Sequence, residues 1–314
     1  MNISIIIPNY NGEKLLKKNL PKVLDAAENY KEGEAEIIII DDASTDKSIL
    51  LIKNYVSSVK NSKISFKILQ NEKNLGFSST VNRGVKEAKG NVVVLLNTDV
   101  APEKDFLKPL MGYFKDESVF AVGCMDKSID DGKIILRGRG IGKWEKGFLA
   151  HKRGEVDKNN TLWVSGGSGA FRKSIWDKLS GFNELYNPFY LEDIDLSYRA
   201  LKSGYKVLFE KKSVVYHKHS EGAIKTHYSE FAIKTIAYRN QFIFVWENAT
   251  DINLQFLHVF WLPYHFFKAL VWLNIPFFLG FLRAFILLPK IIISSFKAQK
   301  MFIKSDCEVV KEFE

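Results

Sequence analysis

The stretch Glu36-Ile37-Ile38-Ile39-Ile40-Asp41-Asp42-Ala43-Ser44-Thr45-Asp46 decides the fold. Its isoleucines place apolar side chains on both faces of an extended chain, so the strand that they form must be covered on both sides. The strand ends at a pair of aspartates and a group of residues typical of turns and helix starts. Strands buried on both faces are typical of a parallel sheet flanked by helices.

The same pattern recurs on either side of this stretch. Further short apolar strands are predicted at 3–7, 66–69 and 92–96, and residues 119–125 favour another. Helical spacing of apolar residues separates them at 15–27, 49–56 and 79–88. We therefore predict an α/β domain with a mostly parallel, Rossmann-like central sheet flanked by helices.

Composition narrows the class of protein. A chain of 314 residues with 46% hydrophobic residues can form one large α/β domain plus an appendage. The net charge of +9, which increases after residue 200, suits an anionic membrane surface or phosphorylated substrates. The chain has no Lys/Arg-rich recognition helix and no zinc-binding spacing, which argues against a nucleic-acid partner. The only cysteines, Cys124 and Cys307, form no metal or redox pattern, which indicates a reducing, cytosolic compartment.

Polar residues follow three of the predicted strands. Asn9, Asp41 with Asp42, and Thr98 with Asp99 come at the carboxyl ends, where ligands bind in such sheets. A single Asp after a strand is more often part of a turn or a helix cap. Acidic residues that follow two strands at the same edge of the sheet instead indicate a binding site. The chain has neither a Gly-x-Gly-x-x-Gly turn nor a Gly-x-x-x-x-Gly-Lys-Ser/Thr loop, which argues against dinucleotide binding and nucleotide-triphosphatase activity.

A second acidic cluster, Glu192-Asp193-Ile194-Asp195, lies where a loop meets a predicted helix. A carboxylate at a helix N-terminus is held ionised and suits general-base catalysis, although an acidic helix cap is the competing interpretation. We assign Asp195 mainly to capping. Upstream, residues 163–172 are predicted as a strand whose glycines mark close approach by a ligand or another backbone, with a structural bulge as the alternative.

Residues 126–160 are polar, glycine-rich and basic, and we expect a hairpin that extends over the site. The tail is different: residues 254–296 are strongly apolar and aromatic. Ala269 to Leu288 is long enough to cross a bilayer of ~30 Å, but Pro263, Pro276 and Pro289 divide the segment into short pieces. Short aromatic helices followed by lysines favour in-plane insertion at a membrane surface. A re-entrant or spanning helix and a homo-oligomer interface are the alternatives.

Five ordered motifs carry a family resemblance: Ile-Ile-Ile-Pro-Asn-Tyr-Asn-Gly at 5–12, Ile-Asp-Asp-Ala-Ser-Thr-Asp at 40–46, Asn-Leu-Gly-Phe at 74–77, Asn-Thr-Asp at 97–99 and Glu-Asp-Ile-Asp-Leu at 192–196. In order and spacing across residues 1–220, the chain resembles inverting family 2 glycosyltransferases of the GT-A fold. Within that family it is most similar to the rhamnosyltransferase and galactofuranosyltransferase-like branch of bacterial surface-glycan synthesis.

The resemblance implies a GT-A catalytic domain at 1–222, with a nucleotide-binding half at 1–100 and an acceptor half at 101–222. Residues 223–314 would form a helical C-terminal region, with its membrane-associating segment at about 254–296. The residues implied to bind the nucleotide-sugar are Pro8, Asn9, Tyr10, Asp41, Asp42, Asn74, Gly76, Asn82, Asn97, Thr98, Gly166 and Gly167.

The same resemblance assigns roles to carboxylates. Asp42 would accept a hydrogen bond from a pyrimidine N3–H, with Asp41 supporting it. Asp193 would be the general base and Glu192 its neighbour at the acceptor. Asp99 and His217 would hold Mn²⁺ or Mg²⁺, although a lone histidine after a strand is more often structural. His219 is a neighbour that could be confused with His217, and it could equally contact diphosphate. The chain departs from the family's Asp-x-Asp metal motif, because Asn97 occupies the first position.

The implied activity is metal-dependent, inverting transfer from a nucleotide-diphosphate sugar, either dTDP-rhamnose or a UDP-sugar. The acceptor would be a hydroxyl of a lipid-linked or cell-surface saccharide, carried on polyprenyl diphosphate. We expect a peripheral or monotopic protein at the cytoplasmic face of the cell membrane, with no nucleic-acid partner. The alternatives are a nucleotidyltransferase acting on sugar phosphates and a non-catalytic membrane scaffold.

Overall fold

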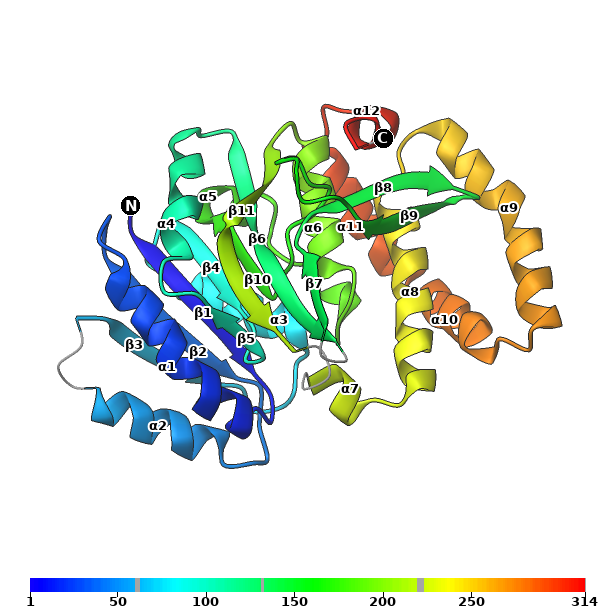
Figure 1. Cartoon of the computed structure of the whole chain (residues 1–314). Coiled ribbons are helices and arrows are strands. Elements are labelled where there is room, and N and C mark those ends of the chain that lie inside the picture. The colour runs from blue at the N-terminus through cyan, green and yellow to red at the C-terminus, as the bar shows by residue number, and fades with distance from the viewer. Residues whose placement is uncertain (60–62, 131–132, 219–222, 314) are drawn as a thin grey trace.

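One mixed β-sheet organises residues 3–217 of the computed structural model, which describes residues 1–59, 63–130, 133–218 and 223–313 (Figure 1). The strand order is β3-β2-β1-β4-β10-β6-β11-β5, and β7 pairs with β6 alone. The strands are β1 Ile3–Asn9, β2 Ala35–Asp41, β3 Ser65–Gln70, β4 Val92–Leu96, β5 Val100–Pro102, β6 Val119–Asp130, β7 Lys133–Arg137, β10 Ser168–Arg172 and β11 Lys206–His217.

The sheet has a parallel half and a mixed half. β1, β2, β3 and β4 run parallel to one another, so their carboxyl ends lie at one edge. Antiparallel β10 lies between β4 and β6, while β11 runs parallel to β6 and antiparallel to β5. The predicted α/β sheet flanked by helices is confirmed, with antiparallel strands in its second half.

Helices cover both faces of the sheet because alternate side chains of each central strand point to opposite sides. Ile37 and Ile39 pack with α1 and α4 residues in one core, whereas Ile38 and Ile40 pack with α3, α5 and α6 residues in the other. The helices of this part are α1 Glu13–Asn29, α2 Ser48–Ser58, α3 Phe77–Lys86, α4 Leu107–Met111, α5 Lys173–Lys178 and α6 Glu192–Lys202, with 3₁₀ turns η1 Gly112–Lys115 and η2 Glu184–Tyr186.

The segment predicted as a strand at 163–172 is shorter in the structure. β10 begins only at Ser168, and Gly166 and Gly167 lie in the turn before it. The turn is closed by the Gly167 amide, which donates to the Ser165 hydroxyl at 3.2 Å. A Cβ on Gly167 would lie 2.7 Å from the Asn97 side-chain nitrogen, so this glycine permits close packing of the turn against Asn97.

The C-terminal part is helical: α7 Ala223–His227, α8 Glu230–Asn248, α9 Ile252–Val271, α10 Ile275–Ile286, α11 Leu288–Gln299 and α12 Asp306–Lys311. Helix α8 packs against α10, α11 and α6 (Figure 1). A fully buried ion pair of 2.8 Å between Lys202 and Asp306 joins α12 to α6. The C-terminal helices are therefore packed onto the sheet domain rather than linked to it loosely.

The expected hairpin within 126–160 is present as β8 Gly140–Glu145 and β9 Phe148–Arg153. Its tip packs on α9, because His258 Nδ1 donates to the Gly147 carbonyl at 2.7 Å while Trp246 Nε1 donates to His258 Nε2 at 3.0 Å. The ring of Phe148 meets the ring of His258 edge to face. These contacts fix the hairpin to the C-terminal helices.

The prolines of the tail act differently from one another. Pro276 and Pro289 lie in the first turns of α10 and α11, where a missing N–H costs no helical hydrogen bond. Pro263 lies inside α9, which continues through it, so the predicted division at this residue is wrong. Within the described residues no single helix is long and apolar enough to cross a membrane, whereas α10 and α11 together meet that test with a 66° bend.

Candidate functional site

A pocket of about 340 Å³ opens at the carboxyl ends of β1, β2 and β4. The turn before β10, the start of α6 and the end of β11 complete its wall. The residues named from the sequence that line it are Pro8, Asn9, Tyr10, Asp42, Asn74, Gly76, Asn97, Thr98, Asp99, Gly166, Gly167, Glu192, Asp193 and His217. Residues more than two hundred positions apart in the chain thus share one cavity.

Several lining residues lie outside the five motifs: Thr80, Ser165, Pro188, Phe189, Tyr190, Ile224 and Tyr228. Phe77, which ends the motif at 74–77, also lines the pocket. Most are apolar or aromatic, and a single sequence does not distinguish such residues from core. Ile224 and Tyr228 follow the boundary predicted at residue 222. The C-terminal region therefore contributes part of the pocket wall.

Asp41 supports the pocket from behind. Its carboxylate is fully buried, with Oδ1 accepting from Asn9 Nδ2 at 2.7 Å and Oδ2 accepting from the Ser44 amide at 3.0 Å. Both oxygens are thus used within the protein. This contact fixes the Asn9 amide, whose Oδ1 points away from Asp41 and has no protein partner.

Asp42 organises the loop that follows β3. Its Oδ1 accepts from Asn71 Nδ2 at 2.7 Å and from the Leu75 amide at 2.8 Å, and its Oδ2 accepts from the Gly76 amide at 3.0 Å. A carboxylate offers about four acceptor positions, so Oδ2 retains one for a ligand donor. Gly76 has φ +88°, a conformation that favours glycine, where the chain turns into α3.

Asn82 lies outside the pocket lining. Its Nδ2 donates to the Phe182 carbonyl at 2.8 Å and its Oδ1 accepts from the Phe182 amide at 3.0 Å. The side chain thus joins α3 to the segment before α6. The structure gives Asn82 a packing role, and the nucleotide contact implied for it has no support in this geometry.

Three buried polar atoms of lining residues have no hydrogen-bond partner in the protein: Asn9 Oδ1, Asn97 Oδ1 and Glu192 Oε2. An unpaired buried acceptor costs about 1–3 kcal/mol, so native proteins rarely keep several in one place. All three residues line the same cavity, which favours a polar ligand there.

The two carboxyls at the start of α6 differ in their surroundings. Asp193 Oδ1 accepts from the Ile194 amide at 2.8 Å, and its Oδ2 accepts from the Gly166 amide at 3.2 Å. Burial raises the pKa of Asp193 while these amides oppose the rise. Burial and then the charge of Asp193 raise the pKa of Glu192 well above its usual value. Of the two carboxyls, Glu192 is therefore the one that takes up a proton first as the pH falls.

Asp195 is not a helix cap. Helix α6 begins at Glu192, and Asp195 is fully buried with its Oδ2 2.7 Å from Arg199 Nη2. Its Oδ1 accepts from Asn248 Nδ2 at 2.8 Å and from the Tyr186 hydroxyl at 3.3 Å. The capping assignment is wrong because a partner one helical turn later draws this carboxylate inward, away from the helix N-terminus.

His217 lies between two carboxylates at the end of β11. Its Nε2 is 3.1 Å from Asp99 Oδ2, and its Nδ1 is 3.1 Å from Asp126 Oδ2. Burial opposes the charged ring, but the hydrogen bonds to Asp126 and Asp99 outweigh burial and raise the pKa of His217 to about 9. Asp126, on β6, was missed because its segment carries no motif. The neighbouring His219 lies outside the described residues.

These donors fit a divalent cation in part. Two ligands about 2.1–2.2 Å from one ion and at right angles lie about 3 Å apart, as Asp99 Oδ2 and His217 Nε2 do. A carboxylate on the other ring nitrogen is the usual support of a metal-bound histidine. Among the described residues no group of three His, Cys, Asp or Glu side chains could hold a metal, so an ion bound at this pair would need further ligands.

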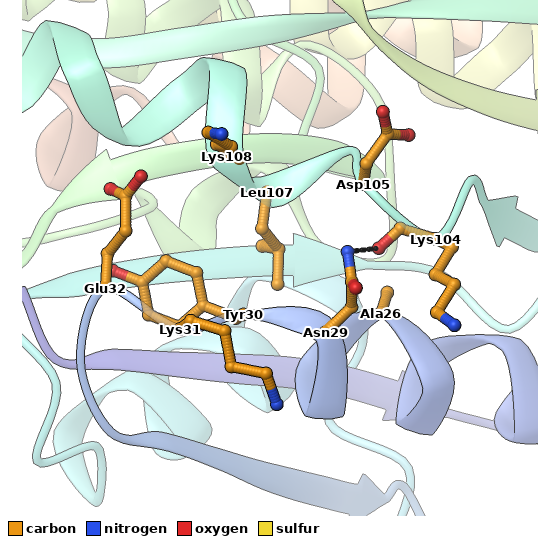
Figure 2. A pocket seen from close by; sticks show the side chains of 9 residues that line it. All are labelled: Ala26, Asn29, Tyr30, Lys31, Glu32, Lys104, Asp105, Leu107 and Lys108. Atoms are coloured by element: carbon orange, nitrogen blue, oxygen red, sulfur yellow. Dashed lines mark hydrogen bonds between the residues drawn. The ribbon is translucent and has the colours of Figure 1, made fainter.

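A second cavity of about 270 Å³ lies elsewhere, between the C-terminal end of α1 and the segment at 104–108 (Figure 2). Asn29 Nδ2 donates to the Lys104 carbonyl at 3.1 Å, and Figure 2 draws this hydrogen bond. Its charged side chains are Lys31, Glu32, Lys104, Asp105 and Lys108. None of the residues named from the motifs lines it, and we assign the functional site to the larger pocket.

Comparison with known proteins identifies relatives of this chain. Residues 4–180 match the profile of "Glycosyl transferase family 2". The O-antigen chain rhamnosyltransferase RfbN of Salmonella typhimurium is 30% identical over 225 residues, which cover 70% of this chain and 67% of RfbN.

Solved structures share the fold. Staphylococcus aureus TarS 1–349 in complex with UDP-GlcNAc superposes with a TM-score of 0.58 at 19% identity, covering 85% of this chain and 73% of that one. GalNAc-T7 with UDP, GalNAc and Mn²⁺ superposes with a TM-score of 0.58 at 20% identity, covering 70% of this chain and 44% of that one. The GT-A architecture expected from the motifs is confirmed.

Proposed function

Because the chain belongs to glycosyltransferase family 2, we propose that it transfers a sugar from a nucleotide-diphosphate donor to a saccharide hydroxyl activated by Asp193. The observation that supports this most is the meeting of Asp42, Asp99, Asp193 and His217 in one pocket. A binding scaffold would need no ionised carboxylate held by two backbone amides opposite a carboxylate–histidine pair.

The proposed reaction is a single in-line displacement. Asp193 takes the proton of the acceptor hydroxyl as the acceptor oxygen bonds to the anomeric carbon. The bond from that carbon to the diphosphate oxygen breaks, and the electron pair leaves with the nucleoside diphosphate. Attack from the face opposite the leaving group inverts the anomeric configuration. In its protonated form Glu192 would donate a hydrogen bond to the acceptor or the sugar, and its raised pKa makes that form easier to reach than for an exposed glutamate.

The donor would bind along the ends of β1, β2 and β4. Asp42 Oδ2 has an acceptor position left for a pyrimidine N3–H, and Asn9 Oδ1 and Asn97 Oδ1 can accept from hydroxyls of ribose or sugar. Similarity to a rhamnosyltransferase supports dTDP-rhamnose, and a UDP-sugar is the competing donor.

We place the divalent cation, Mn²⁺ or Mg²⁺, at Asp99 and His217, with Asp126 holding the imidazole ring. When bound, the ion supplies positive charge that stabilises the departing diphosphate. The 3.1 Å spacing of the two donor atoms supports this placement, as does the GalNAc-T7 neighbour, whose structure contains Mn²⁺. Asn97, at the position of the family's first metal aspartate, leaves the protein with few charged ligands.

The tail supports attachment to a membrane. Large apolar side chains of α9 and the turn after it are exposed, including Phe256 at 69%, Phe260 at 63%, Phe267 at 67% and Trp272 at 76%. In Figure 1, α9 and α10 lie at the end of the molecule away from β3. Exposed lysines accompany this surface, namely Lys268, Lys290, Lys297 and Lys300. An apolar face beside basic residues suits the interface of an anionic bilayer.

We therefore propose a peripheral or monotopic protein at the cytoplasmic face of the cell membrane. There the acceptor saccharide would be carried on a polyprenyl diphosphate, and its reacting hydroxyl would reach Asp193 from the lipid side. A homo-oligomer formed through the same apolar face is the competing use of this surface.

A donor screen tests the proposed activity. The full-length protein in detergent is incubated with Mn²⁺ and a panel of dTDP- and UDP-sugars, and release of nucleoside diphosphate is measured with and without a lipid-linked saccharide. We expect one donor to give acceptor-dependent release. Release from none of the panel, under conditions where nucleotide binds, would contradict the proposal.

A further inference from the structure

We infer that Asn240 of α8, together with Arg239, is a positioning residue for the catalytic carboxylates, so that the C-terminal helical region is part of the active site. The inference rests on the proposed role of Asp193 as the base. The inference concerns residues 186–191, which we name the catalytic loop. This loop runs from the last residue of η2 to the residue directly before Glu192, where α6 begins.

The backbone of the catalytic loop needs outside support. Tyr190 and Leu191 have φ values of 75° and 71°, and side-chain-bearing residues adopt this left-handed conformation rarely. Such residues persist where surrounding contacts hold them, and they concentrate at functional sites. Pro188, Phe189 and Tyr190 line the pocket, so the conformation of the loop shapes the cavity as well as the start of α6.

Asn240 supplies that support from α8. The side chain is fully buried, and its Nδ2 donates to the carbonyls of Tyr190 at 2.7 Å, Phe189 at 2.9 Å and Tyr186 at 3.2 Å. An amide nitrogen has two hydrogens, so the contacts share them. A single side chain thereby gathers carbonyls from both ends of the catalytic loop.

Arg239 completes the contact. Its Nε donates to Asn240 Oδ1 at 2.8 Å, which orients the amide so that Nδ2 faces the loop. Its Nη2 donates to the carbonyls of Asn187 at 2.5 Å and Tyr186 at 3.1 Å. Two neighbouring side chains of α8 thus donate hydrogen bonds to four backbone carbonyls of the segment 186–190.

The opposite side of the loop is held by α3. The Phe77 amide donates to the Pro188 carbonyl at 3.0 Å, and the Ser78 amide donates to Asn187 Oδ1 at 3.0 Å. Helix α3 begins at the donor-side loop that Asp42 organises. The catalytic loop is therefore clamped between the donor-binding half of the sheet domain and the C-terminal helix α8.

Asn240 lies sixty residues beyond the region that matches the family profile, which ends at residue 180. Its neighbours Phe242, Ile243 and Phe244 are buried core residues, so nothing in the chemistry of this helix requires an amide there except the loop carbonyls. The geometry assigns to α8 a direct part in setting the position of Glu192 and Asp193.

The test compares Asn240→Ala with the matched control Asn274→Ala. Asn274 is also an asparagine of the C-terminal helices, and its Nδ2 donates to the Tyr238 hydroxyl of α8 at 2.8 Å without reaching the loop. Arg239→Gln is the milder variant, since it leaves Asn240 in place. Each full-length protein is measured for kcat, for the Kd of nucleoside diphosphate, for Tm, and for hydrogen exchange of the amides at 187–194.

We expect Asn240→Ala to lower kcat by about 10- to 100-fold, because small displacements of reacting groups cost that much. The Kd of nucleotide should stay within about threefold, which separates misplaced chemistry from lost binding. Exchange at 187–194 should accelerate in Asn240→Ala and, to a lesser degree, in Arg239→Gln, and stay unchanged in Asn274→Ala.

Unchanged exchange at 187–194 in Asn240→Ala would overturn the clamp. Faster exchange with wild-type kcat would overturn the positioning of the base. The positioning role would also be overturned if Asn240→Ala and Arg239→Gln both lost kcat, nucleotide affinity and Tm in parallel. Such a result would indicate a general loss of packing rather than a displaced base. If the wild type transfers no sugar, the proposed function fails, while the exchange measurement still decides whether α8 holds the loop.

Discussion

The Nδ1 atom of His217 lies 3.1 Å from the Oδ2 atom of Asp126, a residue that none of the five family motifs contains. Asp126 is on β6 and His217 at the end of β11, two strands that pair in parallel. The carboxylate fixes the ring so that Nε2 faces Asp99 in the pocket. In the proposed metal site, Asp126 would therefore be the support that orients the histidine toward the cation.

We predict that Asp126→Asn weakens Mn²⁺ binding in the presence of nucleoside diphosphate by about 10- to 100-fold, the usual effect of removing such a support. The measurement is calorimetric titration of Mn²⁺, with Asp105→Asn, an exposed carboxylate outside the pocket, as the control. Equal Mn²⁺ affinity in the two variants would remove Asp126 from the metal site.

Asp99→Ala and His217→Ala should abolish the part of nucleotide binding that depends on Mn²⁺. Binding measured in excess chelator should remain as in the wild type, because Asp42 and the loop after β3 are untouched by either change. Titration of nucleoside diphosphate with and without Mn²⁺ checks this. Metal dependence that survives in both variants would place the cation elsewhere.

The transfer rate should fall as the pH is lowered through the pKa of Asp193. A base works only when deprotonated, and burial raises this pKa above the ordinary aspartate value of 3.8. The acidic limb of the kcat profile should therefore lie above pH 3.8, with activity present on the alkaline side. A profile that stays flat down to that pH would contradict the assignment.

Glu192→Gln provides the matched test of which carboxyl carries the charge. Because burial and the neighbouring Asp193 raise the pKa of Glu192 well above 4.5, the protonated acid is close in shape and charge to an amide. We expect Glu192→Gln to keep transfer within about tenfold of wild type, less than the loss of a general base would cost. A loss as large as that of Asp193→Asn would make Glu192 the base.

Replacing Phe256, Phe260 and Phe267 with serine should release the protein from vesicles containing anionic phospholipid. These side chains are exposed and make little contact with the core, so the Tm should change little. Co-sedimentation checks the result, with Leu50→Ser plus Ile134→Ser, exposed apolar residues of the sheet domain, as the control. Deletion of the tail is less informative, since it would remove Asp306 and leave Lys202 buried without its ion-pair partner.

Two outcomes would contradict membrane attachment. Vesicle binding that survives the triple substitution would place the contact elsewhere. A wild type that ignores vesicles but forms an oligomer, which the triple substitution converts to a monomer, would show that the apolar face is a subunit interface.

The sequence was sufficient for the features that depend on local chemistry. Isoleucine runs at 37–40 can form only a strand buried on both faces, and polar residues after such strands must gather at one edge. For this reason the meeting of Asp42 and Asp99 at a common pocket followed from the order of the strands, whereas Glu192 was placed there by the family resemblance. The antiparallel half of the sheet was harder to predict, because β5, β7 and β10 are short or irregular.

Features that depend on tertiary contact could not be predicted. Asp195 has the appearance of a helix cap until Arg199 and Asn248 are seen to bind it inside the core. Asn240 is one of several polar residues of α8, and only the fold brings it to the catalytic loop. Pro263 should end a helix by local rules, yet α9 passes through it.

Asp193→Asn tests the central claim most directly. The substitution removes the base and keeps a side chain of the same shape, whose single amide oxygen can still accept from one of the two backbone amides, Gly166 or Ile194. We predict that kcat falls by about 10²- to 10⁴-fold, the usual contribution of a general base, while the Kd of nucleoside diphosphate is unchanged. Turnover equal to that of the wild type would contradict the account.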